Sequence, residues 1–284
     1  MNNNELNVPV ELIDINTSKL LTAKKHNEVI YPTVRVICFD AGGSGTVVFS
    51  KKNGNGNVET YIITNYHVVE SAISIEEKWV ASLGKKVDKE LKRTVRVETF
   101  KYIKFSRHVG GTSIEADIVA YDQDEDIALL KTRDTENIVM HVANIFPISD
   151  IDNIFITDVI YNVGATHNHP PFSTIGEIAF MDDEIDNYNY WMVTAACSFG
   201  SSGGATMRWD SKRYRWEYIG MPSIGECAID GINLLSHMGY IIPIDRIYRF
   251  LNENNYQFIH DDSIDILKCH EEREKIKKIA RGKQ

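Results

Sequence analysis

A histidine, an aspartate and a serine follow one another along the chain, each within a short segment of its own. His67 lies in Ile-Thr-Asn-Tyr-His-Val-Val, Asp126 in Asp-Glu-Asp-Ile-Ala-Leu-Leu, and Ser202 in Gly-Ser-Ser-Gly-Gly. Gaps of 59 and 76 residues separate the three, and each gap is long enough for several β-strands. A fold that brings these side chains together must therefore join distant parts of the chain.

The three residue types are the parts of a nucleophilic site. A serine hydroxyl is a weak nucleophile near neutral pH and needs a base, for which imidazole has a suitable pKa. A carboxylate on the other ring nitrogen fixes the tautomer and stabilises the imidazolium. We therefore predict Ser202 as nucleophile, His67 as general base and then acid, and Asp126 as the orienting carboxylate. The backbone amides of Gly200 and Ser202, in a glycine-rich turn, are predicted to form an oxyanion hole.

Each segment taken alone has an ordinary interpretation. His67 could be a histidine at a strand end, the Ser-Gly-Gly stretch could be a loop, and Asp126 could be a solvated turn carboxylate in an acidic stretch. The common order and the long spacings favour the joint interpretation as a catalytic triad.

Together these segments resemble those of trypsin-like, chymotrypsin-fold serine proteases, most closely the bacterial Deg-type, high-temperature-requirement branch. Further stretches match that pattern in register: Gly43-Ser44-Gly45, Val163-Gly164, Ile175-Gly176, Tyr218-Ile219-Gly220 and Gly239-Tyr240. The resemblance covers roughly residues 30–255. It implies a mainly β fold of two six-stranded antiparallel β-barrels with a C-terminal helix, and a serine endopeptidase activity. Residues 255–284 are too few for the PDZ domain that Deg-type proteases commonly append.

Domain boundaries follow from that resemblance and from the apolar pattern. We expect an N-terminal extension over 1–30, an N-terminal barrel over 31–140, a C-terminal barrel with its closing helix over 141–256, and a charged tail over 257–284. Apolar, β-branched runs predict strands at 34–39, 46–50, 61–64, 95–105, 114–121 and 127–131 in the first barrel, and at 158–163, 175–181, 191–195, 204–209, 216–219 and 240–242 in the second. Helices are predicted at 69–79 and 244–254.

The resemblance also implies a substrate pocket. Ala196 would lie at its base, Ser223, Ile224 and Gly225 would pair with the substrate backbone, and Met238 and Gly239 would line the far side. None of these side chains is charged, so the pocket lacks the carboxylate that a preference for Arg or Lys needs. An apolar residue is therefore expected before the scissile bond.

The composition limits which classes of molecule the chain is expected to bind. The net charge of -9 argues against general nucleic-acid binding. The resemblance to serine proteases implies that the substrates are proteins or peptides. No run approaches about 18 apolar residues, and the first residues lack the features of a secretion signal, so we expect a cytoplasmic protein without a membrane partner. A viral or phage origin is left open.

Two residue pairs raise narrower questions. His167 and His169 have no cysteine or acidic ligand at suitable spacing, so neither a metal nor another cofactor is expected. Cys197 and Cys227 flank the pocket that the resemblance implies, and the sequence leaves their pairing open.

Residues 80–107 form a basic stretch, with nine Lys or Arg against three Asp or Glu. One interpretation is a solvated hairpin edge protected by lysines. The other is an exosite for an acidic partner, an acidic substrate or a nucleic acid. The first is favoured.

Two functions are consistent with these features. The first is a serine endopeptidase. The second is a catalytically silent member of the same fold that serves as a binding or structural protein, for example in a virus particle. A complete triad favours the first, and a lipase or esterase would need the order serine, acid, histidine along the chain.

Overall fold

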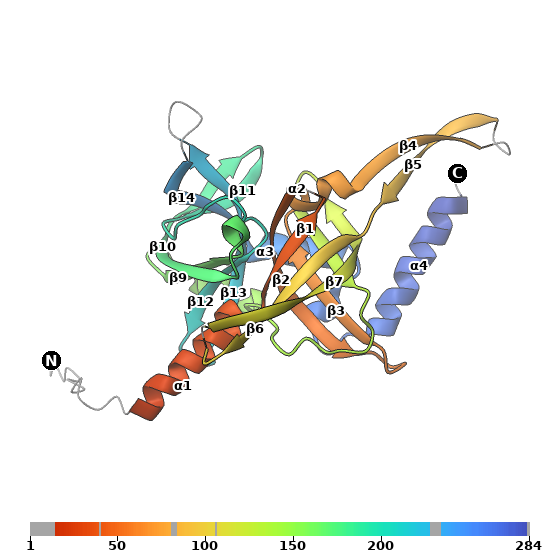
Figure 1. Ribbon diagram of the computed structural model, residues 1–284. Coiled ribbons are helices and arrows are strands. Elements are labelled where there is room, and N and C mark those ends of the chain that lie inside the picture. Colours follow the sequence, from red (N-terminus) through yellow and green to blue (C-terminus); the bar gives the residue numbers. More distant parts are fainter. Residues whose placement is uncertain (1–14, 40, 81–83, 106, 228–233, 283–284) are drawn as a thin grey trace.

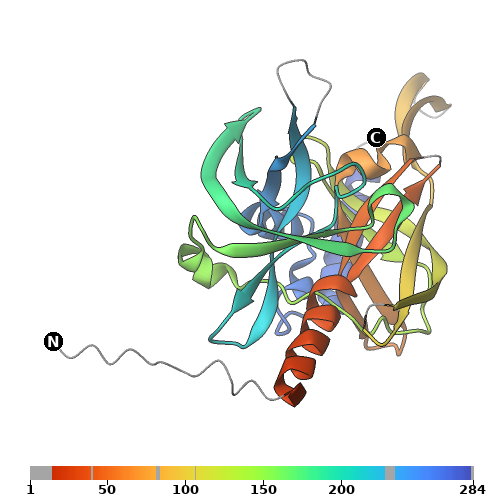
Figure 2. The same ribbon diagram turned by 60° about the vertical axis from the view of Figure 1, so that its left-hand side comes forward.

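Two closed, six-stranded antiparallel β-barrels lie side by side in the computed structural model (Figure 1, Figure 2). The structure describes residues 15–39, 41–80, 84–105, 107–227 and 234–282. This architecture confirms the predicted fold class, a mainly β protein with two barrels and a helix after the second.

The first barrel closes in the order β1-β2-β3-β8-β7-β6. Its strand β1 pairs with both β2 and β6, which removes the open edges. The strands are β1 Thr33–Cys38, β2 Ala41–Lys52, β3 Val58–Thr64, β6 Val95–Ile103, β7 Arg107–Asp122 and β8 Ile127–Thr132.

The second barrel closes in the order β10-β11-β14-β13-β12-β9. Its strands are β9 Val159–Gly164, β10 Phe172–Ile185, β11 Tyr188–Val193, β12 Ala205–Asp210, β13 Arg215–Cys227 and β14 Leu234–Pro243. All twelve barrel strands overlap the strands predicted from the sequence, and most of them extend further than predicted.

Alternate residues of apolar strands in the first barrel pack in two different hydrophobic clusters. Along β8, Ile127 and Leu129 join a larger cluster that they share with the second barrel and the helix that follows it, whereas Ala128 and Leu130 join the cluster of the first barrel. Successive strand residues point to opposite faces, so a strand that is buried on both faces reads as a continuous apolar run. Burial of each such Leu or Ile is worth about 1.5–3 kcal/mol.

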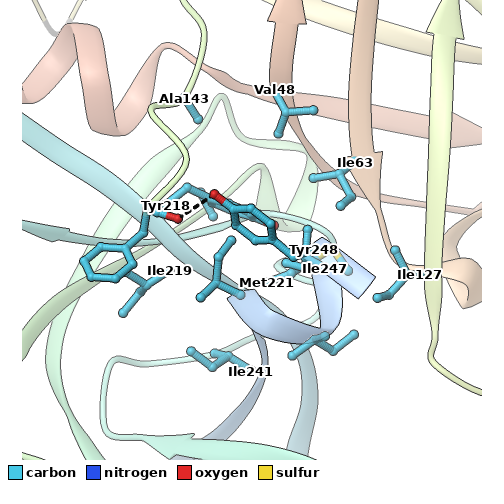
Figure 3. Close-up of a cluster of buried hydrophobic side chains, with 14 of the residues drawn as sticks. Val48, Ile63, Ile127, Ala143, Tyr218, Ile219, Met221, Ile241, Ile247 and Tyr248 are labelled. Atoms are coloured by element: carbon cyan, nitrogen blue, oxygen red, sulfur yellow. Dashed lines mark hydrogen bonds between the residues drawn. The ribbon is translucent and has the colours of Figure 1, made fainter. Parts of the chain in front are cut away.

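Figure 3 shows part of this larger cluster, which joins the two barrels. Val48 and Ile63 approach it from the first barrel, and Met221 and Ile241 from the second. Helix α3, Ile244–Glu253, closes this cluster. Its apolar positions at helical spacing are buried as predicted: Ile244, Ile247, Tyr248 and Leu251. The Tyr248 hydroxyl donates a hydrogen bond of 3.1 Å to the carbonyl oxygen of Phe146 (Figure 3).

The predicted helix over 69–79 is wrong. Helix α2 spans only Tyr66–Val69, a 3-10 turn η3 follows over Glu70–Ala72, and the chain then enters strand β4, Ile73–Val80. Strand β4 pairs residue by residue with β5, Lys85–Lys92, in a two-stranded hairpin outside the barrels. The basic stretch 80–107 is therefore divided between this hairpin and the barrel strand β6.

Helical segments at both ends of the described chain contact the barrels. Helix α1, Ile15–Lys25, runs into a π-helical turn η2, His26–Ile30, whose Val29 is buried in the larger cluster. Helix α4, Ile266–Gly282, buries Cys269 and places His270 Nε2 at 3.0 Å from Glu59 Oε2 of β3. Shorter 3-10 turns are η4 Ile148–Asn153, η5 Thr166–Asn168 and η6 Gln257–Ile259. None of the described helices is both long and apolar enough to cross a membrane.

Candidate active site

The carboxylate of Asp126 holds His67 at two points. Asp126 lies in the turn between β7 and β8, and His67 lies in α2, which follows β3. The ring Nδ1 of His67 is 2.9 Å from Asp126 Oδ2 and 3.0 Å from Oδ1, and the backbone N–H of His67 donates to Oδ1 at 3.0 Å. Main chain and ring of the histidine are thus fixed by one carboxylate.

A third donor to the same carboxylate comes from the second barrel. The hydroxyl of Ser223, on β13, donates to Asp126 Oδ2 at 2.6 Å. The sequence pattern indicates Ser223 only for pairing with substrate and does not reveal this contact. No local pattern signals it, because the two residues are 97 positions apart.

The pKa of His67 is raised above its usual value. Partial burial of the ring lowers the pKa, but the hydrogen bond and the negative charge of Asp126 outweigh that effect, and Glu70 adds a smaller contribution in the same direction. The imidazole is therefore a stronger base than a free histidine side chain.

Ser202 lies in the loop between β11 and β12, and its backbone is fixed by the first barrel. The amide of Ser44, on β2, donates to the carbonyl oxygen of Ser202 at 2.8 Å. The Ser202 hydroxyl donates to the carbonyl oxygen of Ser223 at 3.3 Å. Within the described ranges no hydrogen bond joins this hydroxyl to the His67 ring. Such bonds are often long or poorly aligned before a substrate is bound.

The turn before Ser202 leaves two amides unused. The amides of Gly200 and Ser202 find no hydrogen-bond acceptor among the residues that the structure describes. Gly200 has φ +93, and its carbonyl oxygen accepts a hydrogen bond of 2.6 Å from the Ser44 hydroxyl, which in turn accepts one from the amide of Ala165 at 2.8 Å. Ser44 thereby holds the carbonyl of this turn, and both amides remain available for an anion.

Gly203, directly after the candidate nucleophile, is required by close packing between the barrels. A Cβ at this position would lie 2.2 Å from the carbonyl oxygen of Ser44 and 2.3 Å from Oγ1 of Thr64. Its φ of +83 also disfavours any residue with a side chain. The first barrel therefore leaves no room for a side chain at the first glycine of the Ser-Gly-Gly stretch.

The residues predicted to line the substrate pocket come from adjoining elements. Ser223, Ile224 and Gly225 lie in β13, and Met238 and Gly239 lie in its partner strand β14, with Gly225 opposite Gly239. The side chain of Met238 is 37% exposed, whereas Gly239 is buried. The side chain of Ile224 lies outside the described part.

The loop after β11 carries the predicted pocket base. The Ala196 carbonyl oxygen accepts a hydrogen bond of 2.8 Å from Thr174 Oγ1. The buried side-chain amide of Asn162 donates to the carbonyl oxygen of Ala195 at 3.2 Å and lies 3.3 Å from Cys197 Sγ. Cys197 is a buried free thiol, and burial raises its pKa to about 11. The side chain of Cys227 lies outside the described residues.

The described residues contain no cluster of three His, Cys, Asp or Glu that could hold a metal ion. Of the histidine pair noted in the sequence, His167 lies in η5 with φ +48, and the backbone carbonyl of His169 accepts a hydrogen bond from Arg35.

Comparison with known proteins places the chain among peptidases by sequence. A family model described as a trypsin-like peptidase domain matches residues 43–214, which is more than half of the chain and includes all three candidate catalytic residues. No protein of curated function matches the sequence.

Solved structures share the fold. The serine endoprotease from Yersinia pestis aligns with a TM-score of 0.54 and 20% sequence identity, over 82% of this chain and 65% of that one. Deg5 aligns with a TM-score of 0.55 and 19% identity, over 87% of this chain and 97% of its own. The chain thus spans about two thirds of the length of the Yersinia protein and nearly all of Deg5.

Proposed function

The chain belongs to the trypsin-like peptidase family, and from this we propose that it is a serine endopeptidase that uses Ser202, His67 and Asp126. One observation carries the proposal. The carboxylate of Asp126 accepts hydrogen bonds from the His67 ring, the His67 backbone and the Ser223 hydroxyl, at distances between 2.6 and 3.0 Å. Such a carboxylate fixes the ring tautomer and leaves Nε2 as the proton acceptor.

In the proposed reaction the Ser202 hydroxyl turns from the Ser223 carbonyl toward His67. Nε2 takes the hydroxyl proton while Oγ forms a bond to the carbonyl carbon of the substrate peptide. The resulting oxyanion is stabilised by the unused amides of Gly200 and Ser202. The imidazolium then gives its proton to the leaving amine as the C–N bond breaks. In the second half of the reaction a water molecule gives a proton to His67 and attacks the acyl carbon. The bond to Ser202 Oγ breaks, and His67 returns the proton to that oxygen.

We further propose a preference for an apolar residue before the scissile bond. Ala196, Met238 and Gly239 carry no charge, so binding would depend on size and apolar contact, which discriminate by about 10 to 200-fold per methylene-scale difference. A charged residue would lose its hydration without gaining a partner. Digestion of a peptide library should therefore cut mainly after Val, Ile, Leu, Ala or Met. A digest dominated by cuts after Arg, Lys or Glu contradicts this preference.

Peptide turnover by the purified full chain tests the activity itself. Ser202→Ala and His67→Ala should each lower turnover by several orders of magnitude, because nucleophile and base act as a unit. Ser201→Ala is the matched control, since among the described residues its hydroxyl bonds to the backbone of Ser198 alone. Its removal should lower turnover by less than about tenfold.

The silent-scaffold alternative gives the opposite result. A wild-type chain that cleaves no peptide of any composition, and whose low background rate equals that of Ser202→Ala, would be a binding or structural protein of the same fold.

A further inference from the structure

Glu125, the residue before the candidate triad aspartate, is held by two arginines of α3. Arg246 Nε donates to Glu125 Oε2 at 2.5 Å, and Arg249 donates to Oε1 from the solvent side. The Arg246 side chain is only 2% exposed and that of Glu125 12%, whereas that of Arg249 is 50% exposed. Glu125 belongs to the first barrel and Arg246 to the helix that closes the second, so this ion pair joins the two barrels.

The same guanidinium also bonds to main chain on both sides. Its Nη2 donates to the carbonyl oxygen of Glu125 at 3.0 Å, and its Nη1 donates to the carbonyl oxygen of Asn189 on β11 at 3.0 Å. The ring centroids of Tyr190 and Tyr188 lie 4.6 and 4.8 Å from its central carbon. Arg246 is therefore fixed in the second barrel while it bonds to the turn of the first.

The Glu125 carbonyl belongs to the peptide that carries the nitrogen of Asp126. On the other side of Asp126, its own carbonyl oxygen accepts a hydrogen bond of 3.0 Å from the Asn65 side chain. Between these two peptides Asp126 has φ +53, a left-handed conformation that is unfavourable for a residue with a side chain. A backbone in this region persists only where its surroundings fix it.

We propose that Arg246 is a positioning residue for the reaction: it fixes the peptide between Glu125 and Asp126, and so the direction in which the Asp126 carboxylate faces His67. The inference rests on the proposed serine endopeptidase function. Arg246 lies in the helix that closes the second barrel and contacts no side chain of the triad, yet by this inference it sets the geometry of Asp126 and His67 in the first barrel.

Arginine suits this role for a geometric reason. Its planar fork presents donors in fixed directions, so one side chain reaches a carboxylate and two carbonyl oxygens at once. A lysine keeps the charge but cannot make all three bonds. Stability alone gives little reason for the pair, since buried ion pairs are often no more stabilising than apolar side chains of the same volume.

A double-mutant cycle separates positioning from mere stabilisation. Arg246→Lys and Asp126→Asn are made singly and together, and the rate constant for labelling by a fluorophosphonate probe is measured per folded molecule. Arg246→Lys alone should lower the rate by about 10 to 100-fold, as expected for a misplaced catalytic group. In the Asp126→Asn background the same change should cost less than about twofold, because the carboxylate that Arg246 positions is already gone.

Two further readouts belong to the same test. With a peptide substrate, Arg246→Lys should lower kcat with KM unchanged, and the ionisation seen in kcat/KM should move to lower pH, because His67 loses part of the influence of Asp126. The groups facing His67 are Asp126 and Glu70, and Glu70 is unaltered in every variant.

Arg249→Lys is the control, because its side chain is exposed and contacts the same carboxylate without bonding to the backbone of the Asp126 turn. It should keep labelling within about twofold. If Arg246→Lys does not fold, Glu125→Gln replaces it in the cycle. That variant keeps the shape and loses the charge, and we expect a loss of about 3 to 10-fold.

Equal losses in the wild-type and Asp126→Asn backgrounds overturn the inference, as does a variant whose rate per folded molecule and pH profile match the wild type. If wild type itself does not react with the probe at Ser202, the proposed function fails, and this inference fails with it.

Discussion

Two regions of the molecule differ in how their polar groups are hydrogen-bonded. The seam of the candidate site comprises Ser44, Asn65, Asp126, Ser202 and Ser223. Its hydrogen bonds cross from one barrel to the other in the contacts of Ser44 with Ser202 and of Ser223 with Asp126. The arm is the β4–β5 hairpin, residues 73–92, which projects from the first barrel (Figure 1).

The arm bonds mainly to itself. Its Lys86–Glu77 ion pair has side chains that are 65% and 62% exposed, and Ile75 and Trp79 are 71% and 61% exposed. An exposed pair of this kind is worth about 0–1 kcal/mol, whereas a buried group left without its partner costs about 1–3 kcal/mol. We therefore expect that the loss of one side-chain contact lowers activity or stability strongly in the seam and has little effect in the arm.

The largest effect is expected at Gly203. Gly203→Ala places a Cβ within 2.3 Å of Ser44 and Thr64 and adds the cost of a left-handed alanine, so the free energy of unfolding should fall by about 3 kcal/mol or more. Peptide turnover should fall with it, because the loop of Ser202 must shift. Denaturant unfolding and peptide turnover measure the two effects.

Gly56→Ala is the matched control for that prediction. Gly56 has φ +82, but no atom lies within 4 Å of the position that a Cβ would occupy. Its cost should be limited to the backbone conformation, about 1–2 kcal/mol. Equal losses of stability at both glycines would show that contact between the barrels is not what makes Gly203 necessary.

The next effect concerns Ser44. Ser44→Ala removes the hydrogen bonds to Gly200 and Ala165, so kcat should fall by about 10 to 100-fold as the oxyanion amides lose their position. The free energy of unfolding should fall by about 1–3 kcal/mol. Ser50→Ala is the control, since Ser50 is a buried serine of the same strand with two hydrogen bonds of its own. It should lose similar stability and keep kcat; a similar loss of kcat in both variants would contradict the role of Ser44.

A smaller but diagnostic effect concerns pH. Only neutral His67 accepts the serine proton, and its pKa is raised, so kcat/KM should rise with pH through an ionisation above the usual histidine value of about 6.5. In Asp126→Asn the main cause of the raised pKa is gone, so the ionisation should move to lower pH. A profile that is flat between pH 5 and 8, or one that Asp126→Asn leaves in place, would count against His67 as the base.

The smallest effect is expected on the arm. Lys86→Ala removes an exposed ion pair and should change the free energy of unfolding by less than about 1 kcal/mol, with kcat/KM for short peptides unchanged. Reversal of the arm lysines to glutamate provides the sharper comparison. If that reversal lowers turnover of an acidic protein substrate in a salt-dependent way, the basic stretch is an exosite rather than a solvated hairpin.

The barrels are predictable because burial leaves a local trace in the sequence. The run Ile127 to Leu130 reads as a strand because both of its faces are buried, in different clusters. The arm leaves no such trace, since its described residues mix charges with a few apolar residues, of which Ile73 packs against the core of the first barrel while Ile75 and Trp79 are exposed. For that reason the sequence pattern predicts a helix continuing from α2 where the structure has the strand β4.

The candidate site can be predicted from local sequence patterns only in part. His67, Asp126 and Ser202 each lie in a short motif, so a linear pattern indicates them. The contacts that hold them do not follow such a pattern: Ser44 meets Gly200 at a separation of 156 residues, and Arg246 meets Glu125 at 121. Only folding of both barrels brings these partners together.

The most direct test of the central claim is to locate the adduct formed with a fluorophosphonate probe by peptide mass spectrometry. A site assembled from both barrels predicts one adduct, on Ser202, that forms in wild type and is lost in Ser202→Ala and in His67→Ala, although the serine is still present in the latter. An adduct on another serine, or undiminished labelling of Ser202 in His67→Ala, would contradict the claim.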